Sequence, residues 1–329
     1  MTANRVAELA GVSRSAVSRT FTDGASVSPE TRAKVLAAAA KLGYHVNHLA
    51  RGLIQHRSGI VCIIVPELQA PFQAGMVELL IRRLQDIGKV VMVLSSAGRS
   101  ENAAAALRQT LNYRAEATVV ISGAPPQALI ETCIENGQRV ILINRDDPVA
   151  GPEFVQIDNQ AAAVEAARLL IGAGCTRLGV VTSTAGTPAL VTRERAFIAE
   201  AKAHGFEVSV HAAGPTGYEA GAASARAVLA QQSRPDGIFC VTDLLATGVL
   251  DVARHDFGMR LPEDLSVIGF DDIPQAGWRS YDLTTFRQPI DAVAEKIATA
   301  LASGQELDRS MMRPQVVWRG TVRGAPDPT

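Results

Sequence analysis

Four polar side chains near the N-terminus have the types and spacing needed to contact a polyanion together. Arg14, Ser15, Ser18 and Arg19 would project outward from one short helix. Guanidinium and hydroxyl groups donate hydrogen bonds to DNA phosphates and to base edges. Ser13 precedes them where a helix cap is needed, because its hydroxyl can accept backbone N–H groups of the first turn. These residues indicate a helix that begins at a DNA surface.

The elements that must position this helix are a preceding helix and a tight turn. Gly11 can adopt the positive φ that ends the first helix, and Ala7 is small enough for two helix backbones to approach closely. Apolar contacts between the helices would come from Val6, Leu9, Val12 and Val17. Such a helix-turn-helix can lay its second helix in the major groove; the alternative is a small helical hairpin without a special function.

A third helix would complete this N-terminal headpiece. Ser28 and Pro29 are typical of a helix start and Gly43 of a helix end, so a helix is predicted between them. Residues 44–53, which follow, carry little apolar surface and include a glycine. This segment is therefore expected to become ordered only against a partner.

A second group of polar residues follows apolar runs in the rest of the chain. The runs predict buried strands of parallel sheets and cover residues 60–65, 90–94, 118–121, 140–143, 178–181, 238–241 and 265–269. The polar residues that end them are Ser95, Ser96, Ser122, Asn144, Arg145, Thr182, Ser183, Thr242, Asp243, Asp271 and Asp272. Parallel sheets bind ligands at this edge, and these groups suit a polyhydroxylated ligand.

Helices alternate with these strands, so the fold class is α/β with two doubly wound parallel-sheet lobes after the headpiece. Helices are predicted over residues 72–87, 159–171, 192–204, 217–231, 244–257 and 291–302, the last of which would return to the first lobe. The predicted domains are a headpiece over residues 1–45, a hinge helix and linker over 46–58, and a two-lobed body over 59–329. The first lobe would comprise residues 59–157 and 289–303, and the second residues 158–288.

Charge separates the N-terminal segment from the body. Residues 1–57 carry 8 basic and 3 acidic side chains, whereas the remainder carries 24 and 30. A basic module attached to an acidic body is typical of a protein in which the module alone binds nucleic acid.

The composition also bears on location and cofactors. No run approaches the roughly 20 apolar residues of a membrane span, and the N-terminus does not read as a secretory signal. The cysteines, Cys62, Cys133, Cys175 and Cys240, lie far apart without histidine at metal-ligand spacing. We expect reduced, buried cysteines, no metal or other cofactor, and a cytoplasmic protein that is nucleoid-associated when bound to DNA.

The headpiece sequence resembles the LacI/GalR (lactose repressor) family of transcription regulators. The family pattern V-A-x-x-A-G-V-S-x-x-x-V-S-R is matched over residues 6–19, and L-T-T-x-x-Q-P over residues 283–289. The resemblance implies a body of periplasmic-binding-protein type. It also implies that Arg14, Ser15 and Ala16 read the major groove of a palindromic operator, while Leu53 of the hinge helix enters the minor groove; otherwise Leu53 packs on its own domain. The full set of implied DNA contacts is Thr2, Ser13, Arg14, Ser15, Ala16, Ser18, Arg19, Ser28, Thr31, Tyr44, Asn47, Ala50 and Leu53.

The resemblance extends to the cleft between the lobes. Residues 267–272 are similar to the family's G-[FY]-D-[DN] segment, and residues 193–197 to its R-x-x-G-F segment. The implied effector contacts are Phe72, Gln73, Asn144, Arg193, Thr242 and Asp271. Asp271 could instead cap a turn or pair with a lysine, and Arg193 could form a surface ion pair. Trp278 and Tyr281 could line the cleft or pack the loop.

The function implied is a homodimeric repressor whose operator affinity responds to a small sugar-like effector. A corepressor-type regulator that responds to a nucleobase or phosphorylated metabolite would use the same parts. The dimer surface is expected around residues 75–84 and 247–255, and residues 320–329 lack the leucine heptads of a tetramerising coiled coil. A carbohydrate-processing enzyme is disfavoured because no catalytic motif is present, and a periplasmic sugar-binding protein would carry no headpiece.

Overall fold

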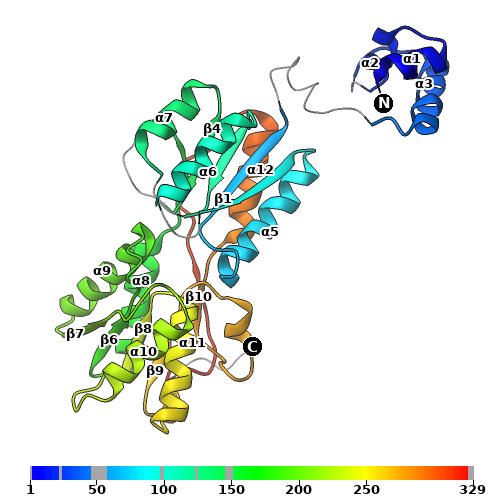
Figure 1. Cartoon of the computed structure of the whole chain (residues 1–329). Coiled ribbons are helices and arrows are strands. Elements are labelled where there is room, and N and C mark those ends of the chain that lie inside the picture. Colours follow the sequence, from blue (N-terminus) through cyan, green and yellow to red (C-terminus); the bar gives the residue numbers. More distant parts are fainter. Residues whose placement is uncertain are drawn as a thin grey trace. The chain divides into compact units, whose positions relative to one another are not determined.

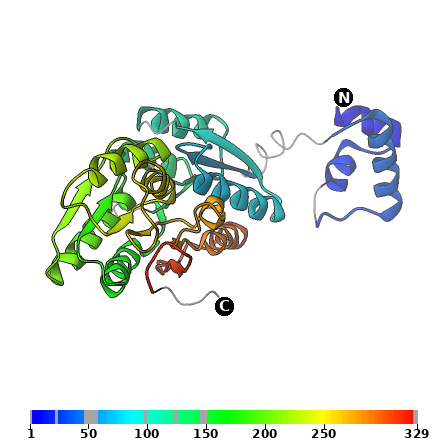
Figure 2. The ribbon, with the colours of Figure 1, turned by 90° about the horizontal axis from the view of Figure 1, so that it is seen from below.

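The computed structural model describes residues 2–21, 24–45, 58–96, 100–122, 125–144 and 151–324. The chain forms two compact units, residues Met1–Ser58 and Gly59–Thr329. Figure 1 labels the helices and strands of both units, and Figure 2 gives a second view. In the described part of the chain, no helix combines the length and apolar character needed to cross a membrane.

The N-terminal unit is a three-helix headpiece. Its core is small, because the buried apolar side chains are Val6, Ala7, Val17, Val35, Ala38 and Ala39. Each helix contributes side chains to this core. Helices this short are only marginally stable in isolation, so their packing against one another stabilises them. The helices are α1 (Ala3–Ala10), α2 (Arg14–Thr20) and α3 (Pro29–Leu42).

Leu9 was predicted to pack between the helices, but it is 47% exposed and lies outside the headpiece core. On a helix with 3.6 residues per turn, Ala3, Val6, Ala7 and Ala10 share the face that packs inward. Leu9 follows Val6 by three residues. It therefore lies next to Val6 on the side away from Ala7, outside this face.

The first lobe of the body is a five-stranded parallel sheet between two helical layers. Its strand order is β2–β1–β3–β4–β5. Helices α5 and α12 bury their apolar side chains on one face, and α6 and α7 on the other. The strands are β1 (Ile60–Val65), β2 (Val90–Ser95), β3 (Ala117–Val120), β4 (Arg139–Ile143) and β5 (Glu153–Val155); the helices are α5 (Pro71–Asp86), α6 (Ser100–Asn112), α7 (Gln127–Glu135) and α12 (Ile290–Ser303).

The second lobe repeats this architecture with a four-stranded parallel sheet in the order β7–β6–β8–β9. Many alanines in its helices allow close approach to the sheet, and Phe197 stacks on Phe239 at 5.1 Å in the core. The strands are β6 (Leu178–Val181), β7 (Val208–His211), β8 (Gly237–Cys240) and β9 (Ser266–Ile268). The helices are α8 (Asn159–Gly172), α9 (Pro188–Ala203), α10 (Tyr218–Leu229), α11 (Asp243–Asp251), η1 (Val252–Asp256) and η2 (Pro274–Gly277).

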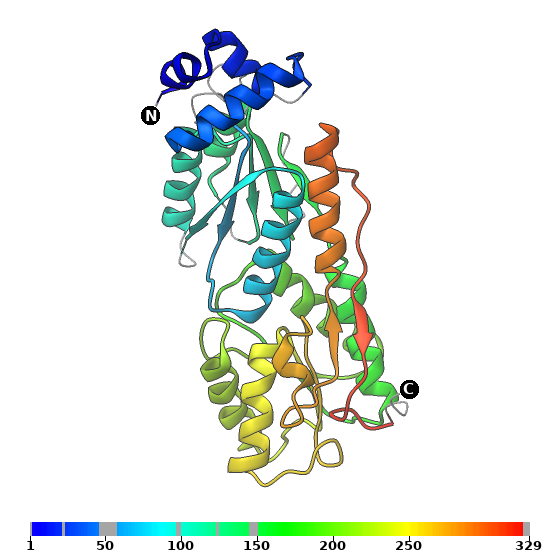
Figure 3. The same cartoon turned by 90° about the vertical axis from the view of Figure 1, so that its right-hand side faces the viewer.

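The chain passes between the lobes three times, as Figure 3 shows. The first passage precedes α8, where Ile157 pairs with Met312. The second runs through β10 (Thr285–Arg287) into α12, and the third returns through β11 (Gln315–Val317), which pairs antiparallel with β10. The first two passages were predicted. The third was not, and it ends with Val322 buried in the core of the second lobe.

The α/β fold class and the doubly wound lobes are confirmed, whereas several elements differ from the prediction. Helix α9 begins at Pro188, four residues before the predicted start, because a proline opens it. The helix predicted over residues 244–257 ends at Asp251 and continues as the π-helical turn η1. The elements that were not predicted are α6, α7, η2, β5, β7, β10 and β11.

Candidate functional site

The headpiece presents a capped helix that could enter a DNA groove. Gly11 adopts φ 64°, which ends α1, and Val12 N donates to Ala7 O at 3.0 Å. Ser13 then caps α2, because its Oγ accepts a hydrogen bond from Ala16 N at 3.2 Å. Arg14 opens the helix directly after this cap. The turn therefore fixes where α2 begins and which of its side chains point outward.

The exposed side of α2 holds the polar residues predicted to contact DNA. Arg14, Ser15, Ser18 and Arg19 are exposed, whereas Val17 faces the core. Ser15 Oγ lies 2.9 Å from Ser13 Oγ. Arg14 and Arg19 are the charged residues of α2, so the exposed side of this helix is positive. Hydroxyl donors beside guanidinium groups suit phosphates and base edges.

The other predicted DNA contacts lie around α2 or outside the described residues. Thr2 precedes α1, and Ser28 caps α3 by accepting from Thr31 N at 3.2 Å. Tyr44 packs against Phe21 with ring centroids 5.9 Å apart. The predicted hinge contacts Asn47, Ala50 and Leu53 fall outside the residues that the structure describes, as does Arg145.

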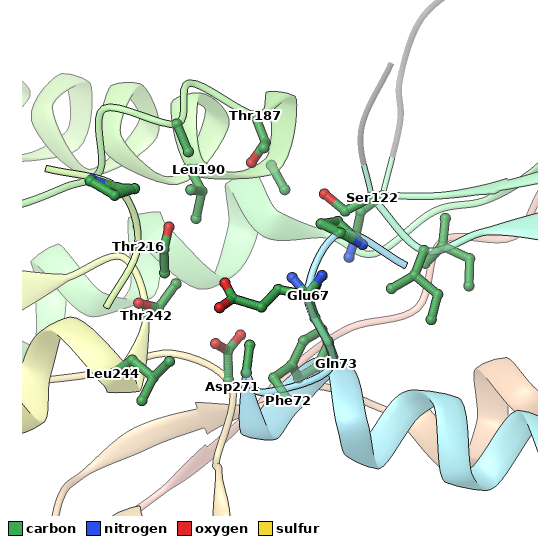
Figure 4. Close-up of a pocket in the computed structure, with 18 of the residues that line it drawn as sticks. Glu67, Phe72, Gln73, Ser122, Thr187, Leu190, Thr216, Thr242, Leu244 and Asp271 are labelled. Carbon is green, nitrogen blue, oxygen red and sulfur yellow. Dashed lines mark hydrogen bonds between the residues drawn. The ribbon is translucent and has the colours of Figure 1, made fainter. Parts of the chain in front are cut away.

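A cavity of about 940 Å³ lies between the two lobes of the body and is lined by residues of both. The structure brings together at this cavity all the residues predicted to contact an effector: Phe72, Gln73, Asn144, Arg193, Thr242 and Asp271. Figure 4 shows the first-lobe side chains Glu67, Phe72 and Gln73 opposite Thr242 and Asp271 of the second lobe.

Only part of the strand-end polar set reaches the cavity. Ser95, Ser96 and Ser122 line it along with Asn144, Thr242 and Asp271. Thr182, Ser183, Asp243 and Asp272 do not line it, contrary to expectation. The side chains of Ser183, Asp243 and Asp272 bond to local partners; for example, Ser183 Oγ accepts from Thr216 Oγ1 at 2.9 Å. Position at a strand end therefore does not by itself bring a side chain into the cavity.

Arg193 is a buried arginine at the cavity wall. It is 3% exposed, so it forms no surface ion pair. Its Nε donates to Asn159 Oδ1 and its Nη1 to Val241 O, each at 2.8 Å, while the guanidinium lies 3.5 Å above the Phe270 ring. Burial lowers the pKa of Arg193 to about 10, which leaves it charged at neutral pH. This arginine is held rigidly in one place.

Asp271 supplies the carboxylate beside Arg193. Its Oδ1 lies 3.6 Å from Arg193 Nη1 and accepts a hydrogen bond from Gln288 Nε2 at 2.6 Å. Burial raises the pKa of Asp271, and the charge of Arg193 opposes this shift. Asp271 and Asn144 adopt φ of 125° and 59°, a region that side chains other than glycine rarely occupy. Such strain is common where a polar group is held for binding.

Asp243 does not line the cavity but bonds to segments next to its wall. The side chain is fully buried, and its Oδ1 accepts from Thr285 Oγ1 at 2.5 Å while Oδ2 accepts from Ile273 N at 2.9 Å. Burial raises the pKa of Asp243, and no cation contacts its carboxylate in the described part of the body. Asp243 thus holds the start of α11 against β10 and the loop after Asp271.

Sequence reasoning missed several lining residues. Residues 184–190, which comprise part of the loop after β6 and the start of α9, form a large part of the wall, and Pro215 and Thr216 also line it. Their signal was a glycine- and proline-containing stretch directly after a predicted strand. Gln288 also lines the cavity; it had been matched only to the crossover segment.

Two other expectations are resolved by the fold. Trp278 and Tyr281 do not line the cavity: Trp278 is 55% exposed, and Tyr281 donates to Asp251 Oδ2 at 3.2 Å. Most of residues 247–255 are buried in the second lobe itself, so only Asp251, Arg254 and His255 of this predicted dimer segment reach the surface.

All four cysteines are free and buried. Across the described ranges, no group of three or more His, Cys, Asp or Glu residues could hold a metal ion.

Comparison with protein families gives two matches. Residues 3–47 match the model described as bacterial regulatory proteins, lacI family. Residues 167–322 match a periplasmic binding protein-like domain. The two matches cover the headpiece, the greater part of the second lobe, and the segment with β10, α12 and β11.

Individual proteins are similar along nearly the whole chain. The HTH-type transcriptional regulator GalS of Salmonella typhimurium is 31% identical over 304 residues, which cover 92% of this chain and 89% of GalS. The structure of the transcriptional regulator CelR–cellobiose complex has a TM-score of 0.71 at 26% identity, covering 98% of this chain and 99% of that one. The Lac repressor dimer bound to operator and the anti-inducer ONPF has a TM-score of 0.87 with the same coverage; at 20% identity it shows the fold alone.

Proposed function

We propose that this chain, which belongs to the lacI family of bacterial regulatory proteins, represses transcription by binding an operator. The ligand in its interlobe cavity raises or lowers the affinity for that operator. It is a DNA-binding transcriptional regulator and not an enzyme. The observation that carries the proposal is a Ser13-capped, positively charged α2 in the same chain as a cavity built around a buried arginine and a carboxylate. We place this repressor in the cytoplasm, where operator DNA is found.

The headpiece supplies the DNA contacts in this proposal. Arg14, Ser15 and Ala16 stand in the first turn of α2, the part of a recognition helix that reaches base edges. Arg19 and the exposed hydroxyl residues supply phosphate contacts, which position the headpiece without reading sequence. The acidic body leaves the headpiece as the source of positive charge for DNA binding.

The cavity takes a small, polar ligand that carries several hydroxyl groups. Seven serine and threonine residues line it, together with Asn144, Arg193 and Asp271. Such a set can pair with both the O–H donors and the oxygen acceptors of a sugar. Phe72 adds an apolar surface on which a sugar ring can rest. The complex of CelR with cellobiose supports a sugar as the first class to test.

The proposed assembly is a homodimer that binds a palindromic operator. Two-fold symmetry in the protein matches two half-sites in the DNA. The Lac repressor structure that shares this fold is a dimer bound to operator. In this proposal, residues 75–84 of α5 contribute to the contact between protomers.

Two assays test the proposal. Operator sites are selected from genomic fragments with the full chain, and the affinity for the selected site is compared between wild type and Arg14→Ala. Ligands are then screened by thermal shift with D-galactose, cellobiose, glucose 6-phosphate, gluconate, cytidine and adenine. We expect a stabilising ligand whose effect disappears in Asp271→Ala.

A charge-matched control separates specific DNA contacts from general electrostatics. Lys202→Ala removes an exposed cation from α9 in the second lobe, and it should leave operator affinity unchanged. Equal loss of affinity in Arg14→Ala and Lys202→Ala would contradict the assignment of α2. Ligand binding that survives Asp271→Ala would place the effector elsewhere.

A further inference from the structure

Two adjacent aspartates after β9 face different parts of the body. Asp271 lines the cavity. Asp272 does not line it, and its side chain is 7% exposed. Both residues have positive φ, 125° for Asp271 and 54° for Asp272. This backbone directs one carboxylate toward the cavity and the next toward the segments that join the lobes.

The carboxylate of Asp272 binds two arginines from two different interlobe passages. Arg287 Nε donates to Oδ2 and Arg319 Nη2 donates to Oδ1, each at 2.6 Å. Arg287 ends β10, which leads into α12 of the first lobe, and Arg319 follows β11, on which the chain returns. Short hydrogen bonds between guanidinium and carboxylate groups are strong and directional. Asp272 therefore connects both passages to one point on the second lobe.

Further contacts make this connection rigid. Arg319 Nη1 also donates to Leu283 O at 2.8 Å, and Arg319 N donates to Thr284 Oγ1 at 2.9 Å. On the cavity side, Asp271 N donates to Phe286 O of β10 at 2.9 Å. Gln288, which donates to Asp271, lies one residue beyond Arg287. A single peptide unit thus separates the cavity carboxylate from the residue that holds the passages.

We propose that Asp272 is a positioning residue that couples occupancy of the cavity to the interlobe passages and so to operator affinity. The inference rests on the function proposed above. A ligand bonded to Asp271 alters the contacts of that residue, and the shared backbone transmits the change to Asp272 and its two arginines. Because the passages join the lobes, their arrangement determines how far the lobes can close. Ligand and operator then influence each other's affinity by one common factor.

The test measures this coupling factor separately from ligand affinity. The probe is the compound of the panel above that gives the largest thermal shift with wild-type protein. Operator affinity is measured for the full chain with and without saturating probe, and probe affinity is measured by calorimetry. We expect Asp272→Asn to bind the probe within about threefold of wild type while its coupling factor falls about tenfold toward one.

Two further variants keep the test informative if Asp272→Asn is unstable. Arg287→Gln removes one of the two contacts from a side chain that is 59% exposed, so it should fold, and its coupling factor should fall in the same direction. Asp272→Glu keeps the charge and should restore part of the coupling. Asp264→Asn is the matched control, because Asp264 also pairs with an arginine, Arg260, but lies away from the cavity.

The outcomes are distinct. A full coupling factor in Asp272→Asn and Arg287→Gln, with only thermal stability reduced, would make Asp272 a structural residue and overturn the inference alone. If no compound of the panel binds wild-type protein, the ligand proposed above for the cavity fails, and the inference fails with it, whereas operator selection tests DNA binding separately.

Discussion

Arg193 Nε donates to Asn159 Oδ1 at 2.8 Å, which joins the cavity arginine on α9 to the first residue of α8, just after the chain has passed between the lobes. Asn159 also donates through Nδ2 to Ile157 O at 3.1 Å. The guanidinium that faces Asp271 is therefore held by a residue at the first interlobe passage. Arg193 and Asp271 are thus both bonded to interlobe passages: Arg193 to Asn159 beside the first passage, and Asp271 to Phe286 and Gln288 in the second.

Removal of Arg193 should destabilise the body. Arg193→Ala leaves the buried Asp271 without its cation, and loss of one partner of a buried pair typically costs about 3–5 kcal/mol of unfolding free energy. Because burial already raises the pKa of Asp271, protonation relieves the unpaired charge in acid. The loss measured by urea unfolding should therefore be smaller at about pH 5 than at about pH 8.

Arg168→Ala provides the comparison for this effect. Arg168 pairs with Glu200 but is 64% exposed, so its removal should cost less than about 1 kcal/mol at either pH. A loss in Arg193→Ala as small as that in Arg168→Ala would show that the buried pair does not stabilise the fold.

Asp243 should give the second lobe a pH-dependent stability. Its pKa is raised by burial, so the folded state holds a proton that the unfolded state has released above the ordinary aspartate value of 3.8. The unfolding free energy contributed by Asp243 therefore falls as pH rises from 3.8, by at most about 1.4 kcal/mol per pH unit. Asp243→Asn should remove this slope, measured as the difference from wild type.

The control for Asp243 is Asp264→Asn. Hydrogen bonds from Arg260 lower the pKa of Asp264 to about 2, so this residue does not titrate in the same window. An identical pH profile in wild type and Asp243→Asn would mean that the carboxylate titrates normally in the folded protein.

Two substitutions of Ser13 should distinguish its effect on the stability of α2 from its effect on DNA binding. Ser13→Ala removes the bond to Ala16 N, which typically costs about 1 kcal/mol, and should lower operator affinity because the first turn of α2 frays. Ser13→Asp restores the cap, yet it brings a negative charge to the proposed phosphate surface. We expect hydrogen exchange of α2 amides to recover in Ser13→Asp while operator affinity does not. Recovery of both would place Ser13 away from DNA.

Arg14 should contribute to sequence preference. If its guanidinium reads a base edge, Arg14→Ala lowers discrimination against one substituted operator position by about 1–3 kcal/mol, measured in competition at fixed salt. Arg260→Ala, in the second lobe, should leave both affinity and discrimination unchanged. If Arg14→Ala weakens all operators equally, Arg14 contacts phosphate instead.

Hydrophobic patterning predicted most of the body. The run at residues 60–65 and the run at residues 178–181 coincide with β1 and β6, because strands buried on both faces have continuous apolar sequence. The missed elements lack this signal. β7 is an edge strand with Val210 47% exposed and a histidine at its end, and β10 and β11 form a short two-stranded ladder whose partners lie far apart in sequence. Tertiary pairing determines these strands.

The chemistry of the site was predicted less evenly. Asn144, Arg193 and Asp271 were found from strand ends and from family motifs, and the structure places them at one cavity. Asp243 and Asp272 stand at equivalent strand ends but turn away, because local backbone φ and buried partners decide the direction of each side chain. Sequence adjacency gives no information on this choice. The double contact of Asp272 with Arg287 and Arg319 therefore required the structure.

The most direct test of the account is a paired titration of the full chain at one salt concentration. Operator affinity is measured with and without the cavity ligand, and ligand affinity is measured with and without operator. The account predicts that ligand changes operator affinity, and that operator changes ligand affinity by the same factor. A ligand that fills the cavity and leaves operator affinity unchanged would contradict it.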